Sequence, residues 1–393
     1  MAMIAAIGHA RALDGREAGL QAAHLALNRL GNNAPVFGIV ISSHQYEAQG
    51  VVNGIASLIG DTPVIGFSSP AGLTSSGLQP HSVTLALIAA TDAHADVTWL
   101  AGYTQGSREV SQQLAEMLNR NPHLPALVFA DGFNADAEQF CASLSAGTNL
   151  IGALSSGDLN AGNAYQIGGT QFGAGGLALA RFEGNIRVGV GYGSGWQPVG
   201  AHFRITRSRG FWVRALDGRP ASEAYAHLFG YPTREWAFPP LNYLARLYPL
   251  GLLAPGTQAP AEQLDKSLQL RSPLRVEADG SFRMNAAVSD GTEVYLLVGS
   301  LSACRQAATA AVDQAMAALE GARPVLALVL TDIAWQMLFE AQPGADVAAV
   351  QAALHADIPI VGGYTLGQII PRAMSSPQFL NQHMVVALFG ETQ

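Results

Sequence analysis

Near the carboxyl end the sequence reads Ile358-Pro-Ile-Val-Gly-Gly-Tyr-Thr-Leu-Gly-Gln368, a short apolar run that ends in glycines and hydroxyl-bearing residues. A continuous apolar run with such an ending is typical of a strand covered on both faces of its sheet. Two earlier segments have the same pattern, Pro63-Val-Ile-Gly-Phe-Ser-Ser69 and Asn149-Leu-Ile-Gly-Ala-Leu-Ser-Ser156. The recurrence indicates one supersecondary unit used three times.

Each of these segments lies between two further apolar strands. The first strands cover residues 35–43, 125–132 and 324–332, and the third strands cover 82–88, 175–181 and 384–389. Apolar residues at helical spacing come before each first strand. Each copy is therefore predicted to read helix, strand, helix, strand, glycine turn, strand. The fold class is α/β, in two domains built from these repeated units, with the sheets covered by helices.

The length of 393 residues exceeds what one hydrophobic core usually holds, so two domains are expected. The residue pattern changes over residues 184–217, where glycines at alternate positions are followed by alternating polar and apolar residues typical of a hairpin. A second hairpin is predicted around Asp279 and Gly280 within residues 274–298. We place the boundary near residue 215, which gives domains of residues 1–215 and 216–393.

Composition excludes several function classes. Hydrophobic residues make up 49% and charged residues 13%, which favours extensive buried sheet or the subunit interface of a homo-oligomer. Lys266 is the only lysine, so a phosphate-binding Gly-Lys-Ser/Thr loop and a polybasic membrane patch are absent. The net charge of -8 gives no footprint for nucleic-acid binding. Without a secretory signal or a membrane-spanning apolar run, the chain is expected to be cytoplasmic.

The glycine turns are the first candidate ligand site. Hydroxyl-bearing residues follow the glycine of each second strand, where backbone amides and hydroxyls can converge on a polar ligand. These residues are Ser68, Ser69, Ser155, Ser156, Tyr364 and Thr365. The alternative is ordinary turn chemistry, in which serine and threonine satisfy the local backbone. If they bind a ligand, losing one hydroxyl should weaken binding with little loss of stability.

The ends of the first strands are expected beside these turns. They carry Ser42, Ser43, His44, Asp131 and Asp332, and Ser42, Asp131 and Asp332 are taken to end equivalent strands. Asp131 fits a helix cap as well as a binding role. Arg271 and Arg275 are the candidates for gripping a carboxylate, although an arginine at the mouth of a strand is often simply solvated.

Several ordered blocks resemble the paired FIST N and FIST C domains across almost the whole chain. The blocks include Val40-Ile-Ser-Ser-His44, Gly195-Trp-Gln-Pro-Val-Gly200, Leu216-Asp-Gly-Arg-Pro-Ala-Ser-Glu-Ala-Tyr225, Tyr248-Pro-Leu-Gly251, Ile360-Val-Gly-Gly-Tyr-Thr-Leu-Gly-Gln368 and Asn381-Gln-His383. Family members commonly have Gly-Glu where this chain has Gly367-Gln368. The resemblance implies a stand-alone bacterial sensory protein that binds an amino acid or a similar small polar metabolite. It also implies a separate signalling protein as partner.

A subset of the family senses nitric oxide through haem, which makes a haem-based sensor the alternative function. His44, His355 and His383 lie nearest the predicted turns and are the candidate axial ligands, but a hydrogen-bonded or exposed histidine is the favoured interpretation at each position. Asp92-Ala-His94-Ala-Asp96 has metal-ligand spacing on an extended segment, but a solvated loop explains it too. We expect no tightly bound metal or cofactor.

Enzymatic function is the third alternative. The sequence has no Gly-x-Ser-x-Gly nucleophile elbow and no dinucleotide fingerprint after a strand. Cys141 and Cys304 stand outside any Cys-x-x-Cys motif or Cys/His cluster, and both are expected to be buried thiols. The sequence thus favours a binding protein over an enzyme.

Overall fold

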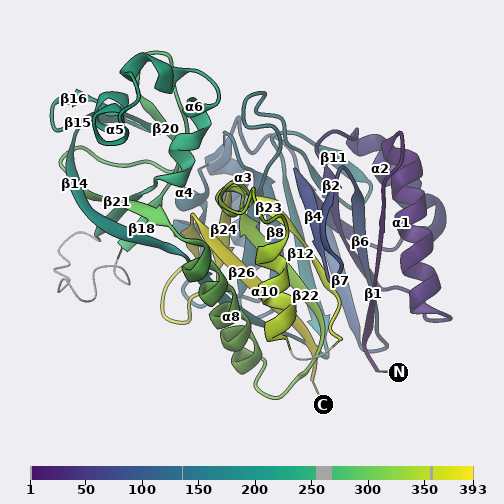
Figure 1. Ribbon diagram of the computed structural model, residues 1–393. Coiled ribbons are helices and arrows are strands. Elements are labelled where there is room, and N and C mark those ends of the chain that lie inside the picture. Colours follow the sequence, from purple (N-terminus) through teal and green to yellow (C-terminus); the bar gives the residue numbers. More distant parts are fainter. Residues whose placement is uncertain (1, 135, 254–267, 355–356, 393) are drawn as a thin grey trace. The chain divides into compact units, whose positions relative to one another are not determined.

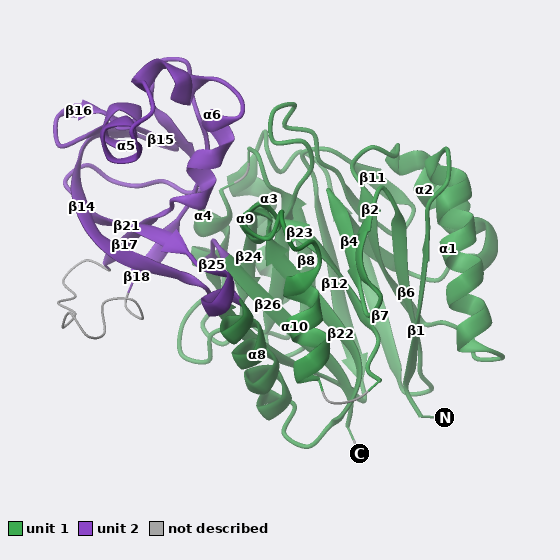
Figure 2. Cartoon of the chain, in the orientation of Figure 1, with its two compact units in different colours: residues 1–194, 305–379, 383–393 green, residues 195–304, 380–382 purple. Residues whose placement is uncertain are grey.

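The computed structural model describes residues 2–134, 136–253, 268–354 and 357–392. The chain forms two compact units (Figure 2). Unit 1 contains residues 1–194, 305–379 and 383–393, and unit 2 contains residues 195–304 and 380–382. The compact units divide at residue 194, whereas the domain boundary predicted from the sequence lies near residue 215, and the C-terminal part of the chain returns to unit 1. The α/β class expected from the sequence is confirmed.

Unit 1, whose helices α1, α2, α8 and α10 are labelled in Figure 1, contains three sheets that share the same order of four strands. The first copy comprises β1 (Ile4–Ala10), α1 (Gly15–Leu30), β2 (Phe37–Ser43), α2 (Ala48–Ile59), β3 (Val64–Ser69) and β6 (Val83–Ala89). The second comprises β7 (Ala93–Leu100), α3 (Ser107–Leu118), β8 (Ala126–Asp131), α4 (Ala137–Ala142), β9 (Leu150–Ser155) and β12 (Leu177–Gly184). The third comprises β13 (Ile186–Ser194), α8 (Leu301–Ala318), β22 (Arg323–Asp332), α9 (Ile333–Leu338), α10 (Ala345–Ala353), β23 (Ile360–Thr365) and β26 (His383–Glu391).

Each copy thus has one more strand than the sequence indicated. The orders are β1-β6-β2-β3, β7-β12-β8-β9 and β13-β26-β22-β23. In every copy the two strands at the end of this order run parallel, and the other neighbours run antiparallel. Superposition of the copies remains a prediction.

A hairpin from a different copy completes each sheet. The hairpins are β4 (Ala71–Thr74) with β5 (Gly77–Pro80), β10 (Gln166–Gly168) with β11 (Gln171–Gly173), and β24 (Gly367–Ile370) with β25 (Gln378–Leu380). The first hairpin extends the third copy's sheet, the second extends the first copy's sheet, and the third extends the second copy's sheet. The strand exchange is therefore cyclic.

The alternate glycines of β13 are explained by close packing against α8. A Cβ atom placed on Gly191 would lie 1.9 Å from the carbonyl oxygen of Ala311, and one on Gly189 would lie 2.2 Å from that of Ala315. No side chain fits at such distances, so glycine is required there. The residue pattern over 184–217 predicts a hairpin, but the glycine-rich part, β13, pairs with β26 in unit 1, and the hairpin begins at β14.

Unit 2 is built around a mainly antiparallel sheet with the order β18-β17-β21-β14-β15-β20-β19. Its elements are β14 (Trp196–Arg209), β15 (Trp212–Leu216), β16 (Arg219–Pro220), α5 (Ala221–Phe229), η1 (Thr233–Ala237), α6 (Leu241–Leu244), η2 (Ala245–Leu247), β17 (Leu250–Leu253), β18 (Leu268–Arg271), β19 (Pro273–Val276), β20 (Phe282–Met284) and β21 (Glu293–Gly299). The two predicted hairpins form as β14–β15 and as β19–β20 around Gly280. Tyr225, Trp236 and Phe282 lie in the core of this unit.

No helix among the described residues is both long and apolar enough to cross a membrane.

Candidate functional site

The three glycine turns meet in unit 1 and exchange hydrogen bonds. Ser68 Oγ donates to the carbonyl oxygen of Ser156 (2.9 Å), and Ser156 Oγ donates to that of Tyr364 (2.5 Å). The Tyr364 N–H then donates to Ser69 Oγ (2.8 Å). All four residues are buried. The six hydroxyl-bearing turn residues named above, which we call the turn ring, therefore link three segments that are far apart in the sequence.

Two members of the turn ring have matching hydrogen bonds. Ser155 Oγ donates to the Ala130 carbonyl (3.0 Å) and accepts from Gln166 Nε2 (2.6 Å). Thr365 Oγ1 donates to the Thr331 carbonyl (3.2 Å) and accepts from Gln368 Nε2 (2.7 Å). Gln368 therefore places an amide donor beside Thr365.

Strand register corrects one equivalence drawn from the sequence. Ser43 pairs with Ser69, as Asp131 pairs with Ser155 and Asp332 with Thr365. Ser43, one residue after Ser42, is therefore the counterpart of the two aspartates. A single-residue shift is hard to see in an uninterrupted apolar strand, because both residues at its end are serines.

The predicted binding residues at the ends of the first strands have partners within unit 1. Asp131 accepts from the N–H groups of Phe133 and Asn134 (3.0 and 2.8 Å), and Asp332 caps α9 through Ala334. Ser42 Oγ accepts from the Tyr165 hydroxyl (2.7 Å), and burial raises the pKa of Tyr165.

Arg271 lies in unit 2, at the end of β18, and is 1% exposed. Its Nη1 atom donates a hydrogen bond to the carbonyl oxygen of the preceding residue, Leu270 (3.0 Å). Arg246, which no sequence pattern singled out, is also buried in this unit. Gln382 Nε2 donates to the Arg246 carbonyl and to Ser272 Oγ, and Gln382 has a φ of 61°. A non-glycine residue at a positive φ is held there only by its surroundings, so the hydrogen bonds of Gln382 fix the backbone of the Asn381–His383 block.

The candidate haem and metal ligands lie in separate surroundings among the described residues. His44 is half-buried, and its N–H donates to the Ser69 carbonyl (3.2 Å). His383 lies beside the Tyr192 ring, with centroids 6.1 Å apart, and His355 falls outside the described residues. His94 faces Glu183 across β7 and β12, and Asp96 pairs with Arg181. Among the described residues, no three metal-ligating side chains come together.

Unit 1 also contains a cavity of about 240 Å³ that no sequence pattern predicted. Its lining comes from β1, the last turn of α1, the β4–β5 turn and the start of β23. The lining residues are Ala5, Ala6, Ile7, His9, Arg29, Thr74, Ser75, Ser76, Asp357, Pro359 and Ile360. We call it the Arg29 cavity. No local motif marks it, because its residues come from four distant segments.

The Arg29 cavity presents charges of both signs. Arg29 donates to the Ile7 carbonyl, which orients its guanidinium beside β1. Burial and the charge of Arg29 lower the pKa of His9, which favours the neutral imidazole. Ser75 Oγ accepts from the Ile360 N–H (3.1 Å), and Asp357 supplies an exposed carboxylate to the same lining. The cavity therefore offers a cation, hydroxyl groups and an anion within one small volume.

A second, wider hollow of about 450 Å³ lies at the N-terminal ends of α1 and α2. Its lining includes Asp14, Arg16, Glu47 and several amide side chains, most of them exposed. Asp14 accepts from the Glu17 N–H (2.9 Å) and so caps α1. The lining is consistent with a solvated surface between two helix ends.

Two family models match adjoining parts of the chain. The FIST N domain model matches residues 36–219, and the FIST C domain model matches residues 221–371. The chain belongs to the FIST family. FIST domains are associated with sensory roles in signal transduction. The boundary between the two matches lies near the domain boundary placed from the sequence, whereas the compact units divide this FIST protein at residue 194.

Other comparisons add little to this assignment. No curated protein shows a significant match to the chain. Among solved structures, phosphoribosylformylglycinamidine synthase II from Thermotoga maritima is 12% identical with a TM-score of 0.23, and the match covers 100% of this chain and 72% of that chain. T. maritima PurL complexed with ATP is 12% identical with a TM-score of 0.24, over 99% of this chain and 72% of that chain. Similarity at this level shows neither a shared fold nor a shared function.

Proposed function

We propose that this FIST protein is a cytoplasmic sensor that reversibly binds a small polar metabolite, an amino acid or a molecule of similar size and charge, and signals through a partner protein. The family assignment supports the sensory role. The Arg29 cavity supports a small polar ligand, because it combines a small volume with groups of opposite charge.

The chemistry of the cavity matches a zwitterion. A guanidinium binds a carboxylate with two parallel N–H···O bonds, and the ligand's carboxylate would bind Arg29 in this way. Asp357 would bind the ligand's ammonium group, and the hydroxyls of Ser75 and Ser76 would serve its polar side chain. The volume of about 240 Å³ lies below the usual range for cofactor pockets, which favours an amino-acid-sized ligand.

Isothermal titration calorimetry with a matched ligand series tests this site. A thermal-shift screen of amino acids first selects a ligand, which is then compared with its carboxamide and with its deaminated acid. Arg29→Gln should weaken binding of the amino acid by about five- to thirtyfold, or about 1 to 2 kcal/mol, because a partly exposed charged contact is lost. The same change should leave the carboxamide's affinity unchanged, since the carboxamide lacks the anion.

Asp357→Asn should weaken binding of the amino acid and leave the affinity for the deaminated acid unchanged. Arg120→Gln and Asp61→Asn are the controls, because both remove an exposed charge elsewhere in unit 1. Thr365→Val and Arg271→Gln are titrated in parallel. If these two variants weaken binding while Arg29→Gln and Asp357→Asn do not, the ligand binds at the turn ring or at Arg271 and the cavity assignment is wrong. If no small metabolite binds at all, the proposed function itself fails.

A further inference from the structure

The strand β1 is the edge of the first copy's sheet and forms one wall of the Arg29 cavity. Among the described residues, its sheet partner is β6 alone. In an antiparallel pair, every second residue bonds to the partner strand with both its N–H and its C=O, and the residues between them point these groups the other way. The other edge of β1 therefore carries backbone groups that no described strand pairs with.

The neighbouring strand pair shows which residues of β1 point outward. The Ser43 N–H donates to the Ser82 carbonyl, so the even-numbered residues of β6 bond to β2 and its odd-numbered residues bond to β1. By register, the even-numbered residues of β1 are the ones that bond to β6. Ala5 and Ile7, which line the Arg29 cavity, consequently turn their N–H and C=O groups away from β6.

The contacts of the outward groups agree with this assignment. The Ile7 carbonyl accepts from Arg29, and at the start of the strand the Met3 carbonyl accepts from Arg323. Between these contacts, the Ala5 N–H, the Ala5 carbonyl and the Ile7 N–H have no hydrogen-bond partner within the described part of the chain. The cavity thus has free backbone donors and an acceptor beside a guanidinium group.

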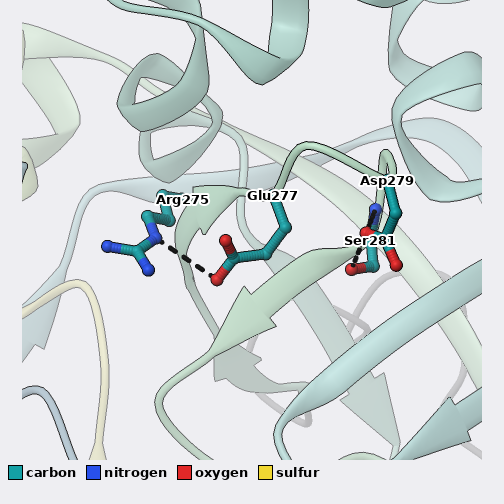
Figure 3. Close-up of polar contacts among 4 residues, drawn as sticks. All are labelled: Arg275, Glu277, Asp279 and Ser281. Atoms are coloured by element: carbon teal, nitrogen blue, oxygen red, sulfur yellow. Dashed lines mark hydrogen bonds and ion pairs between the residues drawn. The ribbon is translucent and has the colours of Figure 1, made fainter.

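Arg29 also differs from an arginine that the sequence suggested for a carboxylate. Arg275 is already paired with Glu277, with 3.2 Å between Nε and Oε1, next to the turn in which Asp279 accepts from the Ser281 N–H (Figure 3). The bond that Arg29 makes in the described structure goes to a neutral carbonyl. Its charge can therefore serve a ligand's carboxylate.

We propose that the Arg29 cavity binds a dipeptide, which adds to β1 as a short parallel strand. In a parallel pair, one residue donates its N–H to a carbonyl of the neighbouring strand and accepts, at its own carbonyl, from the N–H two residues further on. The last residue of the dipeptide would donate its amide N–H to the Ala5 carbonyl. Its carboxylate would accept from the Ile7 N–H and from Arg29. This inference rests on the proposed function, because it names the ligand class of the same site.

The spacing of the charges favours a dipeptide over a free amino acid. Arg323, which holds the Met3 carbonyl, comes just before the part of β22 that pairs with β23, and Asp357 comes just before β23. We therefore expect Asp357 near the start of β1, whereas Arg29 lies at Ile7. Two residues along β1 rise by about 7 Å, which an extended dipeptide also spans, but a single amino acid spans only about 3.5 Å. A dipeptide can thus direct its ammonium group toward Asp357 while its carboxylate stays on Arg29.

Isothermal titration calorimetry with isomeric probes tests the inference. Alanyl-glycine and glutamine have the same atoms and the same charged groups, but only in the dipeptide does a peptide bond separate the two charges. Alanyl-glycine should bind at least about tenfold more tightly than glutamine. Alanyl-sarcosine has a methyl group in place of the amide hydrogen. It should bind about five- to thirtyfold more weakly than alanyl-glycine, because the bond to the Ala5 carbonyl is lost.

Variants separate the two ends of the ligand. Asp357→Asn should weaken alanyl-glycine binding by about three- to tenfold and leave the affinity for N-acetylglycine unchanged, because N-acetylglycine has no ammonium group. Arg29→Gln should weaken binding of both probes, since both carry the carboxylate. The controls Arg120→Gln and Asp61→Asn, which remove exposed charges elsewhere in unit 1, should change neither affinity.

The Ile7 amide gives a direct measurement of the added strand. In protein with isotope-labelled isoleucine, NMR identifies this amide as the resonance missing from Ile7→Val, and alanyl-glycine should shift it. If alanyl-glycine binds without moving this resonance, or if alanyl-sarcosine binds equally well, the strand pairing is wrong. If glutamine binds as tightly as alanyl-glycine, the dipeptide inference fails while the proposed sensor stands. If neither probe nor any other amino acid binds, both proposals fail.

Discussion

Ser68 donates its hydroxyl hydrogen to the carbonyl oxygen of Ser156, 88 residues further along the chain, over a distance of 2.9 Å. The same hydroxyl oxygen accepts from the Tyr165 N–H at 2.9 Å. One buried side chain thus connects the first and second copies of the repeated unit. This arrangement gives the turn ring a structural role whether or not a ligand also binds there.

Replacing Ser68 with alanine should lower the free energy of unfolding by about 2 to 4 kcal/mol, because it leaves a buried N–H and a buried carbonyl without this partner. Urea denaturation measures the change. Ser57→Ala is the control, since Ser57 is exposed on α2 and bonds only within its helix turn in the described structure; its effect should stay within about 0.5 kcal/mol. If Ser68→Ala were as stable as the control but bound the amino acid poorly, the main role of the turn ring would be ligand binding.

The buried pair of Tyr364 and Asp346 should make stability depend on pH. The Tyr364 hydroxyl donates to Asp346 Oδ2 at 2.8 Å, and burial raises the pKa of Asp346 while this bond opposes the rise. Between the ordinary aspartate pKa and the raised native pKa the folded state holds more protons, so stability falls as pH increases. Tyr364→Phe removes the opposing bond, so it should destabilise the protein more at neutral pH than at acid pH.

Urea denaturation of Tyr364→Phe at several pH values measures this difference. In an Asp346→Asn background the cost of Tyr364→Phe should no longer change with pH, because the titrating group is gone. A pH-independent cost in the wild-type background would show that Asp346 is not the group responsible.

Gly191→Ala should destabilise unit 1 by about 3 kcal/mol or more, because the new Cβ would lie 1.9 Å from the backbone of α8 and the helix would have to move. Gly106→Ala provides the contrast. Its Cβ would first meet the flexible end of the Glu109 side chain, at 3.1 Å, so a much smaller change is expected. Thermal denaturation of both variants compares them. Similar melting temperatures would mean that α8 moves at little cost.

We predict that purified protein stays colourless after haem supplementation, because the sequence has no Cys/His motif and its histidines are scattered. Absorption spectroscopy between 350 and 600 nm, roughly the range of haem bands, reads the result. A strong Soret band that disappears on replacing His44, His355 or His383 would favour the haem-based sensor instead.

The strands of the repeated unit could be predicted because a strand covered on both faces has a continuous apolar run, as in Pro324–Asp332 and Ile358–Thr365. The exchanged hairpins could not. Residues such as Gln166 and Gln171 on β10 and β11 give no apolar periodicity. β11 pairs with β10, and β10 pairs with β3 of another copy. Tertiary contacts, not local preference, make these segments strands.

The candidate site divides in the same way. The clustering of the turn residues followed from their recurrence at the ends of parallel strands. The Arg29 cavity could not be predicted from the sequence. Arg29, Ser75 and Asp357 meet only through the fold, and none of them belongs to a motif in its own segment. Arg271 was selected for its chemistry, but no sequence pattern indicated that it would be buried in unit 2 and not at an open cleft.

The cyclic exchange of hairpins has a consequence for synthesis on the ribosome. The first copy's sheet is complete once β10 and β11 have emerged, but the second copy's sheet must wait for β24 and β25, and the third copy's sheet for β26. The hairpin β4–β5 likewise leaves the ribosome long before the strand β23 that it will join. Translation therefore leaves unpaired strand edges for most of the time that the chain is being made, and such edges are open to pairing with other nascent chains. Dependence on a holding chaperone during translation is the expected cost of interlocking three copies in this way.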